Sequence, residues 1–170
     1  MNPMLIGKKI LVVDDEPDIL ETLVDFLDGC TVETASDFES AKRLLVNNNY
    51  DAAILDIMGV NGYELLNLAK VKGIPAMMLT AHALSPANLE KAIGDGACCY
   101  LPKDEMIDIA DHLCDVLKAN AEKSGTSHVW FDKLAPCFEK KWGSYWKNDR
   151  MDALKRLNLI HSRDELERIL

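Results

Sequence analysis

The sequence predicts an α/β fold, in which a doubly wound, five-stranded parallel sheet is followed by a small helical extension. Short apolar runs that end in polar residues alternate five times with stretches of helical periodicity, a pattern typical of parallel sheets covered by helices. The chain has 170 residues, enough for one such core and an appendage. Its composition also changes: residues 1–127 carry 10 Lys and Arg against 21 Asp and Glu, whereas residues 128–170 carry 9 against 7 and hold all three Trp.

The first strand is predicted over residues 9–13, KILVV, a β-branched apolar run that stops abruptly at three acids. These acids are Asp14, Asp15 and Glu16, and Pro17 after them suits the first turn of a helix. The acids therefore lie at the carboxyl end of a central strand, where ligands bind in open α/β sheets. Two adjacent carboxylates about 4 Å apart repel each other by roughly 4 kcal/mol at an effective dielectric near 20. For Asp14 and Asp15 we expect a bound cation, first of all Mg²⁺, and for Glu16 a solvated helix start.

The remaining elements follow from periodicity and stop signals. Helices are predicted where apolar residues recur three and four positions apart, and they end at Gly or Asn. Ser36 and Glu39 have the spacing of a capping box that opens the second helix. In the helix expected over 104–118, Ile107 is assigned to the buried face. The expected order is a helix from 17 to before 29, a strand over 31–35, a helix ending at 47–49, a strand over 51–56, a helix over 63–71, a strand over 75–80, a helix over 86–93, a strand over 98–101 and a helix over 104–118.

Five parallel strands favour the flavodoxin-like order 2-1-3-4-5, in which the first and third strands are neighbours. This order brings Asp56, at the end of the third strand, next to Asp14 and Asp15. Thr80 ends the fourth strand and Lys103 follows the fifth, on the same edge. We therefore expect three carboxylates, one hydroxyl and one ammonium to converge there.

These residues and their order resemble the receiver domain of bacterial two-component response regulators. The motifs are VVDDEP at 12–17, LDIMGVNGYELL at 55–66, LTA at 79–81 and GACCYLPK at 96–103. The resemblance covers residues 8 to about 119. It implies a phosphorelay protein that receives a phosphoryl group from a sensor histidine kinase or phosphotransfer protein and then switches a protein–protein interface. The implied chemistry is self-phosphorylation and self-dephosphorylation, so the chain is not expected to be an enzyme.

The resemblance implies that Asp56 is the phospho-acceptor. Asp14, Asp15, Asp56 and the backbone carbonyl of Met58 would hold Mg²⁺. These residue types suit the chemistry, because a carboxylate can attack phosphorus and the transfer requires charge neutralisation more than covalent help.

The resemblance assigns further roles on the same edge. Thr80 and Lys103 would contact the phosphoryl group, and Tyr100 would be the aromatic switch that turns inward as Thr80 moves. Met58 and His82 occupy the two positions that tune the lifetime of the phosphate. An apolar Met58 does not position an attacking water, which predicts slow autodephosphorylation.

The C-terminal third is predicted to be helical. After a polar linker at 123–127, apolar residues recur at helical spacing within 129–145, and Pro136 predicts a kink or a new start. Asp149 is a candidate cap for a further helix. Ser162, with a glutamate three positions later, has the spacing of another capping box.

The predicted division is a receiver domain over 1–122, a linker over 123–127 and a helical extension over 128–170. A segment of this length buries little core alone, so it should pack on the receiver, on a second copy or on a partner. A cap or dimerisation element is favoured; a homodimer stays open and the output partner is unidentified. The alternative is a DNA-binding transcriptional regulator with helices at 150–159 and 163–170, disfavoured because the second helix carries three acids. A Mg²⁺-dependent phosphatase is a weaker hypothesis, because no lid is evident.

Composition and residue patterns argue against several classes of protein. No apolar run approaches the length of a membrane span, so a cytoplasmic protein is expected. The five cysteines are odd in number and include no CxxC pair, which indicates neither a disulfide framework nor a zinc ribbon. The net charge of -9 argues against nucleic-acid binding by the surface as a whole.

Overall fold

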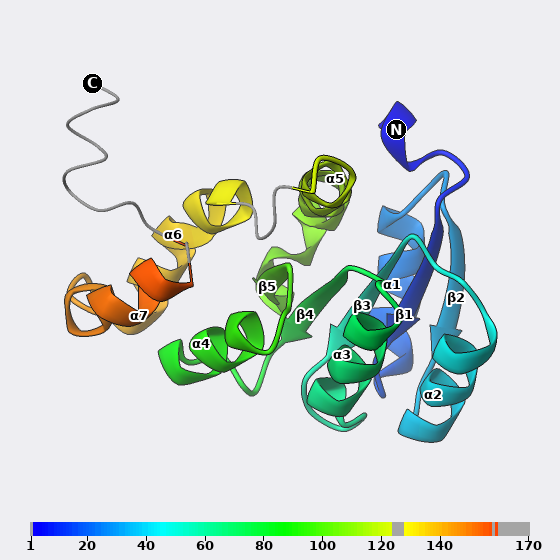
Figure 1. Cartoon of the computed structure of the whole chain (residues 1–170), viewed down its shortest axis with the longest axis horizontal. Helices are drawn as coiled ribbons and strands as arrows, with labels where there is room; N and C mark the ends of the chain where they lie inside the picture. The colour runs from blue at the N-terminus through cyan, green and yellow to red at the C-terminus, as the bar shows by residue number, and fades with distance from the viewer. Residues whose placement is uncertain (1, 124–127, 158, 160–170) are drawn as a thin grey trace.

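The computed structural model describes residues 2–123, 128–157 and 159. Its centre is one parallel sheet with the strand order β2-β1-β3-β4-β5 (Figure 1). The fold class and the strand order predicted from the sequence are confirmed. The strands are β1 (Lys9–Val13), β2 (Thr31–Ala35), β3 (Ala52–Asp56), β4 (Ala76–Thr80) and β5 (Cys99–Pro102).

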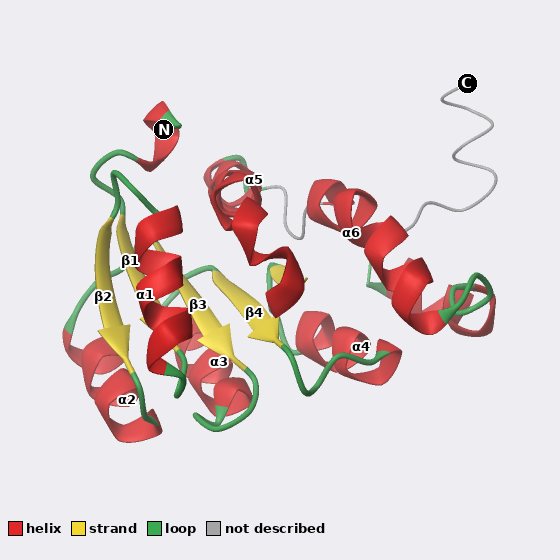
Figure 2. Cartoon of the chain, turned by 180° about the vertical axis from the view of Figure 1, so that it is seen from behind, coloured by secondary structure: helices red, strands yellow, loops and turns green. Residues whose placement is uncertain are grey.

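Helices cover both faces of this sheet, as the alternation in sequence requires. Two of them, α1 and α5, lie on one face, and α2, α3 and α4 lie on the other (Figures 1 and 2). Every residue of β3 and β4 is buried because both faces are covered. The helices of this part are α1 (Pro17–Phe26), α2 (Phe38–Asn47), α3 (Gly62–Val71), α4 (Pro86–Gly94) and α5 (Ile109–Ala121), with 3-10 turns η1 (Pro3–Leu5) and η2 (Lys103–Asp108).

The strand register places the carboxyl ends of the central strands at the same height along the sheet. Val13 pairs with Leu55, so that Asp14 and Asp56 are the next residues on neighbouring strands. Thr80 pairs with Pro102, which places Lys103 immediately beyond the same level. The four polar residues therefore share one edge of the sheet.

The start of α2 differs from the capping box predicted at Ser36. Asp37 is the cap instead: its Oδ1 accepts a hydrogen bond from the backbone N of Ser40 at 2.8 Å. An aspartate caps as well as a serine does, and the chain stays extended for one residue more than predicted.

The helix predicted over 104–118 begins as a 3-10 turn, η2, and becomes α-helical only at Ile109. Ile107, assigned to the buried face, is 69 % exposed. The reason is geometric, because three residues per turn direct a side chain differently from 3.6 residues per turn.

The extension contains α6 (His128–Trp142), a 3-10 turn η3 (Asn148–Arg150) and α7 (Met151–Arg156). Pro136 lies inside α6, so the alternative of a new helix start there is wrong. Asp149 lies within η3 and does not cap α7, whose N-cap position is Arg150 without a side-chain bond. Tyr145, part of the predicted apolar stripe, is 77 % exposed.

The helix predicted over 150–159 is thus shorter, and the features predicted at 124–127, at Ser162 and over 163–170 lie outside the described residues. The described extension lies beyond β5 at the edge of the sheet, next to α4 and α5 (Figure 1). None of the helices in the described ranges combines the length and apolar character that a membrane crossing requires.

Candidate functional site: an acidic pocket at the strand ends

The structure brings four of the predicted polar residues into one buried site. Asp14, Asp56, Thr80 and Lys103 are all buried, although each belongs to a residue type that is usually exposed. They are buried because they terminate or follow strands whose other residues form the core. Asp15 lies beside them and is exposed.

Lys103 connects the ends of three strands. Its Nζ lies 2.8 Å from Asp14 Oδ2, 2.8 Å from Glu16 Oε1 and 3.4 Å from Asp56 Oδ2. Glu16, which we assigned to a solvated helix start, is therefore a third carboxylate partner of the lysine. The run of three acids after β1 was the only sequence signal for this contact. The run alone does not indicate which of its acids faces Lys103.

The charges of the pocket perturb one another. Burial, and then the neighbouring Asp14, raise the pKa of the Asp56 carboxyl to about 6, although Lys103 acts in the opposite direction. Burial alone would lower the pKa of Lys103, but its close contacts with the carboxylates of Asp14 and Glu16 outweigh burial and raise it. The hydrogen bond to Lys103 lowers the pKa of Glu16. One ammonium thus serves several carboxylates, and the pocket keeps an excess of negative charge.

The donor set fits a hard divalent cation. Asp14, Asp15 and Glu16 each offer one carboxylate oxygen, and these atoms lie within 4.8 Å of one another. Asp14 Oδ2 is buried and contacts Lys103 as an ion pair, but it accepts no well-directed hydrogen bond within the described part of the chain. An all-oxygen, anionic cluster with an unused buried lone pair suits Mg²⁺.

The loop between β3 and α3 closes over this pocket. Gly59 has φ +83°, and a side chain there would overlap the carboxylate of Asp15. Gly62 opens α3 so close to the backbone of Asp56 that a Cβ atom would collide with its carbonyl oxygen. Asn61 between them adopts the left-handed conformation, with φ 52°. The two glycines therefore position the loop that carries Met58.

Thr80 and Tyr100 are joined through the loop after β4. Thr80 Oγ1 accepts a hydrogen bond from the backbone N of Ala83 at 2.9 Å. The Tyr100 hydroxyl donates to the carbonyl of Ala83 at 2.6 Å and accepts from the N of Ser85 at 3.2 Å. The ring of Tyr100 is fully buried, and burial raises the pKa of its hydroxyl.

The two residues assigned to phosphate lifetime lie at the solvent side. Met58 is 53 % exposed, and His82 is also exposed. Neither is held by the buried lysine.

Comparison with known proteins gives one consistent family. A sequence model described as response regulator receiver domain matches residues 10–113. The chain is 31 % identical over 134 residues to the two-component response regulator ARR10 of Arabidopsis thaliana, a match that covers 72 % of this chain and 24 % of that protein. The chain spans less than half the length of each of these curated relatives.

Solved structures agree with the sequence comparison. A CheY-like receiver domain protein from Methanospirillum hungatei superposes with a TM-score of 0.63 at 27 % identity, covering 69 % of this chain and 98 % of that one. A response regulator protein from Burkholderia pseudomallei, with a phosphorylated aspartic acid and a calcium ion, superposes with a TM-score of 0.59 at 26 % identity, covering 69 % and 71 %.

Proposed function

This chain belongs to the response regulator receiver family, and from that premise we propose that Asp56 is its phospho-acceptor. The observation that carries the proposal is the placement of Asp56: a buried carboxylate at the end of β3, in contact with Lys103 and beside the acids that follow β1. The phosphorylated aspartic acid of the Burkholderia neighbour supports it.

The proposed reaction is the transfer of a phosphoryl group from a phosphohistidine donor. One Oδ atom of Asp56 attacks phosphorus, a P–O bond forms, and the P–N bond breaks. The donor imidazole leaves with the electron pair of that bond, as neutral imidazole where its other ring nitrogen carries a proton and otherwise as an imidazolate that takes up a proton from solvent. With a pKa of about 6, most Asp56 is ionised at neutral pH and can act as the nucleophile.

The other residues position and neutralise the group. Asp14, Asp15, Asp56 and the backbone carbonyl of Met58 would hold Mg²⁺, which when bound supplies positive charge to the phosphoryl oxygens. Lys103 provides a second positive charge, already within 3.4 Å of Asp56. The Thr80 hydroxyl would donate a hydrogen bond to an oxygen of the attached group, and Met58 and His82 would govern access of hydrolytic water.

We propose the same domain boundaries along the chain as those predicted from the sequence. Residues 1–122 form the receiver, 123–127 the linker and 128–170 a helical extension that serves as a cap, dimerisation or partner-binding element. The donor is a sensor histidine kinase or phosphotransfer protein, and the output is a change in a protein–protein interface. Because the chemistry modifies the protein itself, the chain acts as a switch and not as an enzyme with turnover.

The experiment that tests Asp56 is phosphorylation by acetyl phosphate, followed by intact-protein mass spectrometry with and without Mg²⁺. We expect one phosphoryl group per chain in the presence of Mg²⁺ and none in Asp56→Asn. Asp51→Asn is the matched control, because Asp51 precedes the same strand at the opposite edge of the sheet, where it accepts a bond from the N of Lys9. Normal phosphorylation of Asp56→Asn would refute the proposal.

A further inference from the structure

The extension packs on Tyr100, the last residue of the hydrogen-bond path that begins at Thr80 in the acidic pocket. The rings of Tyr100 on β5 and Phe138 on α6 lie 6.2 Å apart between centroids, and both side chains are fully buried. Helix α6 contacts both β5 and α5. The buried position of Tyr100 is therefore completed by a segment outside the residues that the family match covers.

Behind Phe138 the extension forms a continuous aromatic cluster. Phe138 stacks on Trp142 with 4.7 Å between centroids and an angle of 3° between planes. Trp146 packs edge-on against Trp142 at 4.9 Å. A change at Tyr100 thus meets a packed set of rings and not a single mobile side chain.

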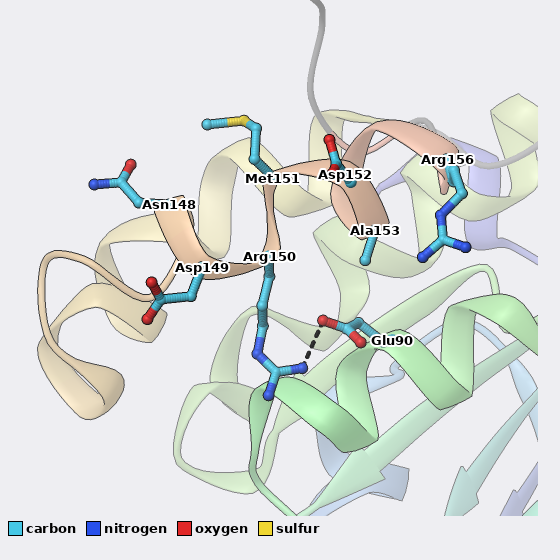
Figure 3. A pocket seen from close by; sticks show the side chains of 8 residues that line it. All are labelled: Glu90, Asn148, Asp149, Arg150, Met151, Asp152, Ala153 and Arg156. Carbon is cyan, nitrogen blue, oxygen red and sulfur yellow. Dashed lines mark hydrogen bonds and ion pairs between the residues drawn. The ribbon is translucent and has the colours of Figure 1, made fainter.

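Ion pairs surround this apolar contact. Each joins a cation of the extension to an acid of the receiver part, so the contact has an apolar centre and a charged rim. Figure 3 shows one of them, in which Arg150 reaches across to Glu90 on α4. The pairs are Lys133 with Asp115 at 2.6 Å, Lys141 with Asp104 at 2.8 Å and Arg150 with Glu90 at 2.6 Å.

The contact between the extension and the receiver part leaves some buried hydrogen-bond donors without a partner among the described residues. The indole nitrogens of Trp130 and Trp146 are buried and have no hydrogen-bond partner within the described residues. A buried donor without a partner costs about 1–3 kcal/mol, and exposed ion pairs return on the order of 1 kcal/mol or less each. These unpaired donors therefore reduce the free energy that burial of the aromatic side chains contributes to docking.

The path from Phe138 to the pocket consists of contacts already described. Phe138 packs on Tyr100, whose hydroxyl donates to the carbonyl of Ala83, and the N of Ala83 donates to Thr80 Oγ1. Because Thr80 Oγ1 already accepts one bond, its own proton remains available to donate. Accepting a hydrogen bond also strengthens the hydroxyl as a donor. Thr80 is thus preset to give a hydrogen bond to an anionic group.

We propose that docking of the extension onto Tyr100 presets Thr80 for the phosphoryl group, so that docking and occupation of the Asp56 pocket stabilise each other. The inference rests on the proposed function and adds that the extension of this chain is the element that responds to occupation of the Asp56 pocket. Linkage is reciprocal, so a group bound at Asp56 tightens the docking by the same factor by which docking tightens its binding. Phe138 and Tyr100 act as positioning residues in this scheme.

The chain carries its own reporters for the test. All three tryptophans of the sequence lie in the extension, so their emission reports the environment of the extension and not that of the acidic pocket. The probe is trifluoroberyllate with Mg²⁺, a tetrahedral analogue of the phosphoryl group, titrated into the full chain. We expect saturable changes in tryptophan emission in the wild type and none in Asp56→Asn.

Variants locate the coupling. Phe138→Ala should weaken binding of the analogue by about 5-fold or more, the lower range of allosteric coupling. Tyr100→Phe keeps the ring but removes both hydroxyl bonds, and it should weaken binding in the same direction. Phe138→Leu, which retains an apolar contact, should restore most of the affinity. Lys140→Ala is the control, because Lys140 lies exposed on the same helix.

The outcomes are distinct. If wild-type Asp56 accepts phosphate from acetyl phosphate but Phe138→Ala and Tyr100→Phe bind the analogue as the wild type does, the inference is wrong and the proposed function stands. A loss in Phe138→Ala alone also overturns it, because the Tyr100 hydroxyl would then carry nothing. If the wild type accepts no phosphate, both fall. Should Phe138→Ala not fold, Tyr100→Phe decides.

Discussion

Replacing Asp56 by asparagine should stabilise the metal-free protein. The structure raises the pKa of this carboxyl from 3.8 to about 6, first through burial and then through Asp14. One pKa unit corresponds to about 1.4 kcal/mol, so an ionised Asp56 lowers the free energy of unfolding by about 3 kcal/mol. Asparagine keeps the shape and removes the charge, but it weakens the contact with Lys103. We expect a net gain of about 1–3 kcal/mol at pH 7.5.

The gain has a defined pH dependence. Above pH 6 the folded chain holds an ionised Asp56, and the penalty is fully present. Between pH 6 and 3.8 the folded state takes up a proton before the unfolded state does, so the wild type gains stability relative to the variant as the pH falls. Below pH 3.8 both states are protonated and the difference disappears.

The assay is urea unfolding in EDTA across this pH range, comparing the wild type with Asp56→Asn. Asp25→Asn, a change at an exposed position of α1, is the control for removing one negative charge. Saturating Mg²⁺ should narrow the difference, because a ligand of the folded wild type stabilises it by mass action. A variant that is less stable than the wild type at pH 7.5, or a difference independent of pH, would refute the electrostatic reasoning.

Three further predictions use other parts of the structure. Met58→Asn should shorten the lifetime of the phosphorylated protein, measured by mass spectrometry after removal of the donor, because a polar side chain at this exposed position can orient water; an unchanged lifetime would count against it. Gly59→Ala should weaken Mg²⁺ binding in a calorimetric titration, since the added methyl overlaps Asp15 and the φ of +83° is strained for alanine; wild-type affinity would contradict the proposed role of Asp15. Burial, followed by the nearby Lys133, lowers the pKa of His112, so the folded chain resists its protonation and loses stability as the pH falls below 6.5. His112→Gln should make that acid loss smaller in thermal unfolding, and an identical decline in both proteins would show that the histidine is not responsible.

The sheet could be predicted because its signals are local. Each strand is a short apolar run with a polar stop, and alternation with helices then leaves few topologies. The errors concern details that local patterns do not determine. Asp37 and Ser36 are both adequate caps, and only the extension of the backbone by one residue decides between them. Ile107 fits a helical stripe in sequence but lies in a 3-10 turn.

The pocket could be predicted to the extent that strand ends define it. Asp14, Asp56, Thr80 and Lys103 follow from topology alone, since parallel strands end at one edge. Glu16 was missed because it lies on the first turn after the strand, where periodicity allows it to face either solvent or Lys103. The contact between Tyr100 and Phe138 could not be predicted either, because it depends on how two segments dock, and hydrophobic periodicity does not identify the partner of a helix.

The position of α6 has a consequence for solubility. Strand β5 is an outer strand of the sheet, and its residues are all buried. Outer strands with apolar side chains are templates for pairing with a foreign strand, which begins aggregation. Here a helix from the same chain lies against that border (Figure 1). Fragments cut after α5 would lose this shield and should precipitate or form mixed assemblies at concentrations that the whole chain tolerates.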